Sequence, residues 1–252
     1  MMKRTNKKPT LIYGKHVIYE ALLKRPETIE RLIIGNCSEK ADFIELAKLK
    51  NIPVQEFNKK TLPKDILEMA HQHVLAHIHT DRLVQDYKTF IEKQTISNDT
   101  AFLLVQKLHD THNLGSLIRS AAAFGISGVL IPKDNQAPLS AGTLKASVGA
   151  IFEVPLVQIG NISNTLKDLK DRGFWTYDMV QDGKNPLNKE IFDTPAVFVV
   201  GNEHTGVQKN IQSICDIHLQ IGMNPKCESL NAAISGAIAM QTWSTQHPNS
   251  LK

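Results

Sequence analysis

The last sixty residues constrain the fold most strongly, because two apolar strands there each run into a polar loop and then a helix. Residues 196–200 lead into a glycine-bearing loop, and residues 217–223 lead into a second loop that opens an alanine-rich helix. In an open α/β sheet, ligands bind at the carboxyl ends of strands, where backbone N–H groups at helix starts are free. We therefore expect the polar residues Glu203, Ser229 and Asn231 to border a site.

Strand and helix patterns alternate along the rest of the chain from residue 11 onward. We expect strands at residues 31–35, 54–57, 74–78, 102–106, 128–132, 154–159 and 174–180. We expect helices at residues 15–24, 38–50, 62–70, 140–148 and 164–171, with a further helix that ends at Gly125. This alternation predicts an α/β fold whose sheet is mostly parallel and is covered by helices on both faces.

A polar stretch divides the chain into two parts. Residues 81–100 combine scattered charges with turn-forming residues, and we interpret them as a linker. The linker separates a small α/β domain at residues 11–80 from a larger α/β domain at residues 101–252. Residues 1–10 are basic, contain a proline and are expected to form a disordered tail.

Basic charge is concentrated in the first part of the chain. Residues 1–80 hold 14 Lys and Arg against 9 Asp and Glu, a surplus of +5, whereas residues 81–252 hold 15 against 16, a balance of −1. Such an asymmetry indicates that the first part meets a polyanion such as a nucleic acid. A basic tail that only aids solubility explains the same numbers.

The composition excludes two broad classes of protein. No apolar run reaches the roughly 18 residues of a membrane span, and the basic N-terminus lacks the apolar segment of a secretory signal. Cys37, Cys215 and Cys227 are odd in number and lack metal-ligand spacing, so neither a disulfide framework nor a zinc site is expected. A reduced, cytoplasmic location fits this pattern.

Two common ligand motifs fail on inspection. The loop at residues 201–206 has the GxxxxG spacing of a phosphate-binding loop, but Val207 and Gln208 follow it instead of Lys and Ser or Thr. Two histidine pairs, at residues 71 and 73 and at residues 77 and 79, have strand-alternating spacing, but neither has a cysteine or carboxylate at ligand spacing. We therefore expect no metal.

Asn113 and Arg119 lie on the helix that ends at Gly125. Six helical residues separate two side chains by about 600°, which leaves them within about 120° of each other, so both could border one pocket. The neighbours of Arg119 are apolar, which predicts that Arg119 is partly buried and needs an anion or hydrogen-bond acceptors. A solvated helix charge is the alternative.

Three motifs in the second domain, at residues 110–121, 198–206 and 221–231, resemble those of the SpoU/TrmH family of RNA ribose 2′-O-methyltransferases and occur in the family's order. Residues 13–16, 52–54 and 70–76 are similar to the small ribosomal-protein-like substrate domain of the subgroup that acts on 23S rRNA. Together these segments extend the resemblance over nearly the whole chain.

The resemblance implies S-adenosylmethionine as the cofactor and assigns roles to individual residues. The catalytic group would consist of Asn113, Arg119, Glu203, Ser229 and Asn231. The cofactor would be held mainly by backbone groups of Gly201, Ile221, Met223 and Leu230. A side chain at Gly201 would then intrude on the cofactor. By the same resemblance, Arg119 would share or stabilise the charge that develops on the ribose 2′-hydroxyl.

The resemblance also implies a trefoil knot in the second domain, a homodimer formed through that domain, and no metal. A guanosine in the peptidyl-transferase loop of 23S rRNA would be the substrate. A tRNA ribose methyltransferase and a non-catalytic RNA-binding protein that kept the fold are the alternatives. The chain departs from the family's usual residues at Thr111, His204, Gly222, Pro225 and Ala233.

Overall fold

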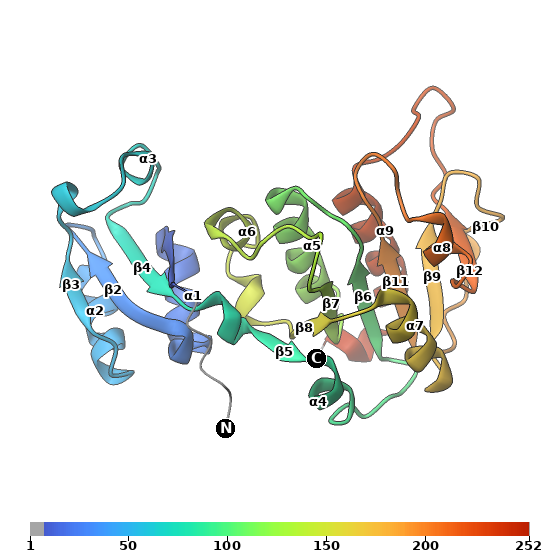
Figure 1. Ribbon diagram of the computed structural model, residues 1–252, viewed down its shortest axis with the longest axis horizontal. Coiled ribbons are helices and arrows are strands. Elements are labelled where there is room, and N and C mark those ends of the chain that lie inside the picture. The colour runs from blue at the N-terminus through green and yellow to red at the C-terminus, as the bar shows by residue number, and fades with distance from the viewer. Residues whose placement is uncertain (1–7, 252) are drawn as a thin grey trace.

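The alternating patterns produce two separate sheets, as a computed structural model of the chain shows for residues 8–251 (Figure 1). Residues 1–7, and with them most of the expected basic tail, lie outside the described residues. Thr10 already belongs to the first strand, where it pairs with Ile78, so ordered structure begins earlier than expected. The predicted α/β class is confirmed.

The smaller sheet has the strand order β1-β4-β2-β3. Its strands are β1 (Thr10–Tyr13), β2 (Ile29–Ile34), β3 (Val54–Glu56) and β4 (Val74–Ile78). Strand β4 pairs antiparallel with β1 and β2, and β3 pairs parallel with β2. The associated helices are α1 (Lys15–Lys24), α2 (Lys40–Leu49) and α3 (Lys64–Leu67). Helix α1 buries its apolar face, which consists of Val17, Ile18, Ala21 and Leu22.

The larger sheet has the order β10-β12-β9-β11-β6-β7-β8-β5, and every strand pairing recorded in it is parallel. Its strands are β5 (Val84–Asp86), β6 (Ala101–Val105), β7 (Gly128–Pro132), β8 (Leu156–Ile159), β9 (Trp175–Met179), β10 (Asn185–Pro186), β11 (Ala196–Val200) and β12 (Ile217–Gln220). Because all strands run the same way, the loops that follow them lie at one edge of the sheet.

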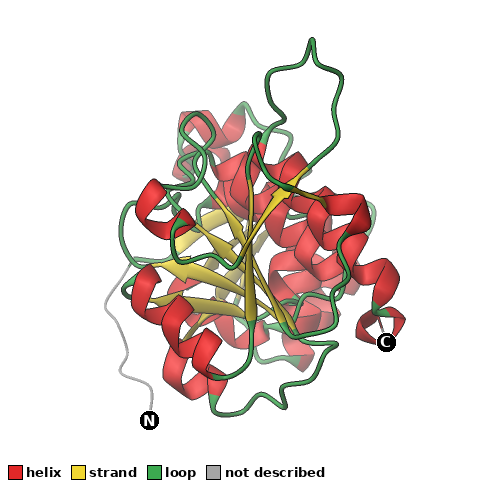
Figure 2. Cartoon of the chain, turned by 90° about the vertical axis from the view of Figure 1, so that its right-hand side faces the viewer, coloured by secondary structure: helices red, strands yellow, loops and turns green. Residues whose placement is uncertain are grey.

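Helices cover both faces of the larger sheet (Figure 2). Alternate residues of β6 show the division, since Leu103 packs with one cluster and Leu104 with the other. Helices α5 (Thr111–Ala123), α6 (Ala141–Ala146) and α9 (Ala232–Gln246) cover the first face. Helices α4 (Tyr87–Ile91), α7 (Ile162–Asp171) and α8 (Lys209–Gln212) cover the second.

Part of the expected linker belongs to the larger sheet. Strand β5 pairs with β8 at the sheet edge, and α4 follows β5 directly. The Tyr87 hydroxyl donates to Asp168 on α7 at 2.6 Å, which ties this segment to the second face. The strand escaped detection because three residues at a sheet edge carry too little hydrophobic periodicity to be recognised.

The two sheets share a hydrophobic cluster, so the halves of the chain pack directly against each other. The ammonium of Lys145 on α6 lies 4.9 Å from the centre of the Tyr13 ring at the end of β1. Lys24 at the end of α1 forms ion pairs with Glu20 and, across the domain boundary, with Glu153. These contacts fix the small domain beside α5 and α6.

Helix α2 begins at Lys40, two residues later than expected, so Ser38 lies outside it; the Ser38 hydroxyl accepts a hydrogen bond from the Lys15 ammonium at 2.8 Å. His71 and His73 lie before β4, as the strand expected at residues 74–78 requires, and the backbone of His73 is left-handed, with φ of 59°. The segment is a turn held by a hydrogen bond between His73 Nδ1 and the Asn36 carbonyl oxygen at 2.9 Å. Within residues 8–251, no helix combines the length and apolar character required to cross a membrane.

Candidate active site

The two strands with polar loops, β11 and β12, flank β9 and end at the same edge of the larger sheet. The loops after β9, β11 and β12 enclose a pocket of about 320 Å³. Figure 1 shows the orange-red loop after β12 rising above this edge. The four residues expected to bind the cofactor, Gly201, Ile221, Met223 and Leu230, all line this pocket.

A chain of hydrogen bonds connects the wall of this pocket to α5 and α9. Glu203 lines the pocket, and its Oε1 accepts from the Asn113 amide on α5 at 3.2 Å. The Asn113 Oδ1 accepts from the Asn231 amide at 2.9 Å. Asn231 in turn caps α9, because its Oδ1 accepts from the N–H groups of Ala233 and Ile234 at 2.8 and 3.3 Å. Three of the five predicted catalytic residues therefore form one network.

Each member of the network is oriented by its neighbours. The Asn231 side-chain oxygen already accepts from two backbone N–H groups. Its amide nitrogen, which can only donate, therefore points toward Asn113. Asn113, which is only 8% exposed, must then direct its own amide nitrogen at the Glu203 carboxylate. This order fixes both side chains without any bound partner.

Glu203 is held in its ionised form. Partial burial of the carboxylate opposes ionisation, but hydrogen bonds from its own backbone N–H, from the Asn113 amide and from the Asp110 N–H outweigh burial. The pKa of Glu203 therefore lies below its ordinary value. Donors aimed at a carboxylate stabilise its charged form in this way, so Glu203 is an acceptor throughout the neutral pH range.

Asn202, which sequence reasoning did not select, builds the loop after β11. Its Oδ1 accepts from the N–H groups of His204 and Thr205 at 3.0 and 3.1 Å, and its Nδ2 donates to the Lys107 carbonyl oxygen at 2.9 Å. A side chain that bonds the backbone two residues further on is a typical turn former. An asparagine directly after a strand-ending glycine was the signal that could have identified it.

The structure gives Gly201 a role in the loop after β11. A Cβ atom at Gly201 would overlap the backbone of Gly206 and Val207, which folds back against it. The glycine is therefore required by the loop itself, because Asn202 and Gly206 exchange backbone hydrogen bonds at 2.9 and 3.0 Å. Intrusion on a ligand is not needed to explain a glycine at this position.

Ser229 lies on the exposed loop before α9 and lines the pocket. Its carbonyl oxygen accepts a hydrogen bond from the Cys227 thiol at 3.4 Å. Ser229 is therefore at the pocket but outside the Glu203–Asn113–Asn231 network.

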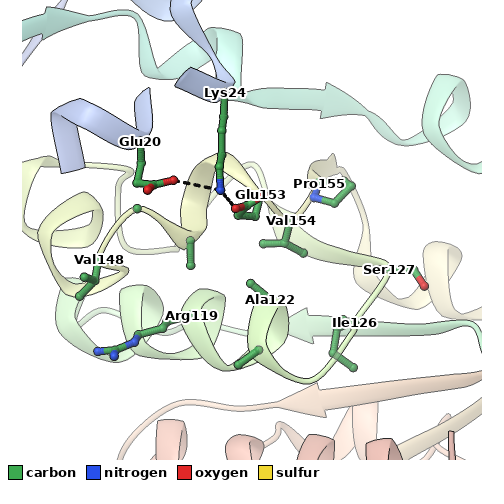
Figure 3. A pocket seen from close by; sticks show the side chains of 13 residues that line it. Glu20, Lys24, Arg119, Ala122, Ile126, Ser127, Val148, Glu153, Val154 and Pro155 are labelled. Atoms are coloured by element: carbon green, nitrogen blue, oxygen red, sulfur yellow. Dashed lines mark ion pairs between the residues drawn. The ribbon is translucent and has the colours of Figure 1, made fainter. Parts of the chain in front are cut away.

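Arg119 is not brought to this pocket, and the expectation that it is partly buried beside Asn113 was wrong. Its side chain is exposed and, among the described residues, forms no hydrogen bond or ion pair. Arg119 lines a different cavity of about 580 Å³ between α1 and α5. Figure 3 shows it beside Val148, apart from the Lys24 ion pairs. Its apolar sequence neighbours are buried on the opposite side of α5.

Three of the five departures from the usual family residues fit the backbone. Thr111 is the first residue of α5, a position that suits proline as well. Neither His204 nor Gly222 has a left-handed backbone, and a Cβ at Gly222 would meet open space. These positions therefore impose no strain. In the described part of the chain, no three His, Cys, Asp or Glu side chains gather in a way that could hold a metal ion.

Comparison with known proteins identifies both parts of the chain. The family model of the SpoU rRNA Methylase family matches residues 100–241, and the model for RNA 2′-O ribose methyltransferase substrate binding matches residues 11–83. A Staphylococcus saprophyticus protein assigned to the TrmH family of tRNA/rRNA methyltransferases is 31% identical over 234 residues, which cover 91% of this chain and 93% of that protein.

Solved structures share the fold. The AdoMet-bound rRNA methyltransferase of Sinorhizobium meliloti has a TM-score of 0.77 and 21% identity, and covers 94% of this chain and 87% of its own. The SpoU methyltransferase AviRb of Streptomyces viridochromogenes has a TM-score of 0.76 and 20% identity, with 96% and 90% covered. The family-model match over residues 100–241 and the 31% identity to the staphylococcal protein show that the chain belongs to the SpoU family of RNA methyltransferases.

Proposed function

We propose that this protein transfers the methyl group of S-adenosylmethionine to a ribose 2′-hydroxyl in RNA. The observation that carries the proposal is the pocket at the ends of β9, β11 and β12, whose wall includes Glu203, the first member of the ordered Glu203–Asn113–Asn231 network. Membership of the SpoU family supplies the reaction class.

The pocket suits this cofactor in size and charge. Its volume of about 320 Å³ falls at the lower end of the range of about 300–1,000 Å³ that is usual for small-molecule sites. Met179, Ile221 and Met223 supply apolar walls, and the carboxylates of Glu203 and Glu228 favour a cation. When bound, S-adenosylmethionine would supply an electrophilic methyl group on a positively charged sulfur.

The network would orient the ribose. A ribose hydroxyl is a weak acid, and fixed hydrogen-bond donors and cations lower the free energy of the alkoxide that develops from it. Asn113 and Asn231 are held in single orientations, Ser229 is exposed at the pocket, and the ionised Glu203 keeps the Asn113 amide in place. We assign the first three to contact with the substrate and Glu203 to positioning.

We propose that Arg119 acts across a homodimer formed through the second domain. Arg119 is exposed and lines another cavity, so it does not reach the pocket of its own chain. Ile234, at the start of α9, is 51% exposed although Ser235 beside it lines the pocket. A second copy that covered Ile234 would therefore lie at the mouth of the pocket, where its arginine could meet the ribose.

The path of the chain supports a knot in this domain. Helix α8 lies on one face of the sheet and α9 lies on the other, so residues 221–231 cross the carboxyl ends of the strands between them. Asn231 at the end of this crossing contacts Asn113 on α5. We propose that the crossing passes through the loop after β11, which would give the trefoil path.

The substrate proposed here is a guanosine in the peptidyl-transferase loop of 23S rRNA. The N-terminal match to a substrate-binding module and the surplus of positive charge in residues 1–80 support RNA as the partner. The family name of the staphylococcal relative includes tRNA as well, so tRNA is the second candidate. The three cysteines of this chain are free, which suits action in the reducing cytoplasm.

Methylation of RNA from a strain that lacks this gene tests the proposal. The purified protein, labelled S-adenosylmethionine and either 23S rRNA or tRNA would be incubated, and alkali-resistant linkages would be mapped. We expect one resistant guanosine linkage in 23S rRNA. Label confined to tRNA would select the second candidate, and RNA binding without transfer would identify a non-catalytic protein. Glu203→Gln, which keeps an acceptor for Asn113, is the matched control and should reduce but not abolish transfer.

A further inference from the structure

Asp178 is a buried carboxylate that no catalytic role explains. It lies near the end of β9 with no exposed surface. Its Oδ1 is 2.6 Å from Nδ1 of His218 on β12, whereas its Oδ2 is buried and has no hydrogen-bond partner among the described residues. An unpaired buried carboxylate oxygen costs free energy, so its presence calls for an explanation beyond stability.

The pair lies directly beneath the proposed cofactor pocket. Asp178 and His218 are register partners in the pairing of β9 with β12. The residues that follow Asp178, from Met179 to Gln181, line the pocket, and so do Ile221 and Met223, which follow β12. The pair is thus the last hydrogen bond between side chains of the two strands before their loops become pocket wall.

Few other links hold these two loops together. The Val180 N–H donates to the Leu219 carbonyl oxygen at 3.0 Å, and the Gln220 amide donates to the Gln181 carbonyl oxygen at 2.8 Å. Strand β10, on the outer side of β12, has only two residues. The spacing of the β9 and β12 ends therefore depends strongly on the hydrogen bond between His218 and Asp178.

The electrostatic surroundings agree with a role outside stability. Burial raises the pKa of Asp178, and the hydrogen bond and charge of His218 oppose that rise. From the turn before β12, the buried thiol of Cys215 faces the same carboxylate. Near the same thiol, Lys170 on α7 forms an ion pair with Asp216 at 2.7 Å. The ionised carboxylate is disfavoured in the fold, so folding alone would gain from its removal.

We propose that Asp178 and His218 are positioning residues of the cofactor pocket: their hydrogen bond sets the spacing between the loop at 179–181 and the loop at 221–223. The inference rests on the proposed function, because it names S-adenosylmethionine as the ligand whose affinity reports that spacing. A displacement of pocket walls by a fraction of an ångström is enough to alter binding measurably.

Calorimetric titration of the full-length protein with S-adenosylmethionine tests the pair. Asp178→Val removes the acceptor and the buried charge, and should weaken binding by about tenfold or more without lowering the melting temperature. His218→Leu should weaken binding by a similar factor. The double variant should bind like either single variant, because the two residues act as one unit. Asp178→Asn retains an acceptor for His218 and should restore affinity to within about threefold of wild type.

The other end of the same strands offers a matched control. The Thr176 hydroxyl donates to Asp216 Oδ2 at 2.7 Å and links the starts of β9 and β12, away from the pocket. Thr176→Val should lower the melting temperature and leave affinity within about threefold of wild type. Equal affinity losses in Thr176→Val and Asp178→Val, or no rescue by Asp178→Asn, would overturn the inference. Wild-type protein that binds no S-adenosylmethionine would overturn the proposed function and this inference with it. If all the variants bound S-adenosylmethionine with wild-type affinity, the inference alone would be overturned.

Discussion

Replacement of Asn113 by aspartate probes the network most directly. The substitution Asn113→Asp keeps the shape of the side chain and the acceptor for Asn231, but it places an oxygen where an amide nitrogen now lies 3.2 Å from the Glu203 carboxylate. Two unit charges at that separation repel by about 5 kcal/mol at an effective dielectric constant of about 20. The protein can avoid this repulsion by keeping a proton on one of the two carboxyl groups.

Protonation limits the cost. Holding a carboxyl group of ordinary pKa, about 4, in its protonated form costs about 4 kcal/mol at pH 7 and about 1.4 kcal/mol at pH 5. Because this protonation cost of about 4 kcal/mol is smaller than the charge repulsion of about 5 kcal/mol, the protonated form prevails up to neutral pH. The introduced group takes the proton, since the backbone N–H groups that lower the pKa of Glu203 remain in the variant. Its folded-state pKa is thus raised above the unfolded value, so stability is lost as pH rises, at up to about 1.4 kcal/mol per unit.

Urea unfolding at pH 5 and pH 7 measures this dependence. The variant should be destabilised relative to wild type by up to about 3 kcal/mol more at pH 7 than at pH 5. Ser116→Asp, which adds a charge to the exposed side of the same helix, should show almost no difference between the two values. An Asn113→Asp penalty that does not change with pH would refute the contact between Asn113 and Glu203.

Three further predictions follow from the site. Gly201→Ala should disrupt the loop after β11 and abolish S-adenosylmethionine binding. Gly206→Ala, at a left-handed position with open space, should cost only about 1 kcal/mol of stability by urea unfolding. Equal effects of the two substitutions would contradict the close packing of Gly201 against Gly206 and Val207. Ile234→Arg should convert a dimer to monomers in light-scattering chromatography, and an unchanged mass would place the interface elsewhere. Arg119→Ala and Glu203→Ala proteins, each inactive alone, should recover about a quarter of wild-type activity when equimolar amounts exchange subunits. Half of the dimers are then mixed, and each mixed dimer holds one intact site out of two. No recovery would mean that Arg119 and Glu203 of the same subunit act in one site.

Local sequence patterns were sufficient to predict the architecture of the larger domain. Residues 128–132 and 196–200 form strands with the predicted bounds, because a continuous apolar run must be buried on both faces of a parallel sheet. The strand–loop–helix order then implied that the loops gather at one edge. The predictions failed for β5 and β10, which have three and two residues and lie at the sheet edges.

The sequence by itself also selected the polar residues of the site, because Glu203, Ser229 and Asn231 follow strand ends within recognisable motifs. Their arrangement came only from the tertiary structure. Asn113 and Asn231 are 118 positions apart, and their hydrogen bond exists because α5 and α9 pack on the same face of the sheet. Sequence spacing carries no information about such a contact.

Arg119 shows the limit most clearly. Its apolar neighbours suggested burial, but a helix has two sides, and only the packing of α5 against α6 and α9 decides which side is covered. The same packing decides the role of Gly236: a Cβ there would lie 2.6 Å from Leu117, so this glycine serves a contact within the chain. The sequence determined which groups are available for the chemistry, and tertiary packing decided which of them meet, because long-range contacts depend on the faces that helices bury.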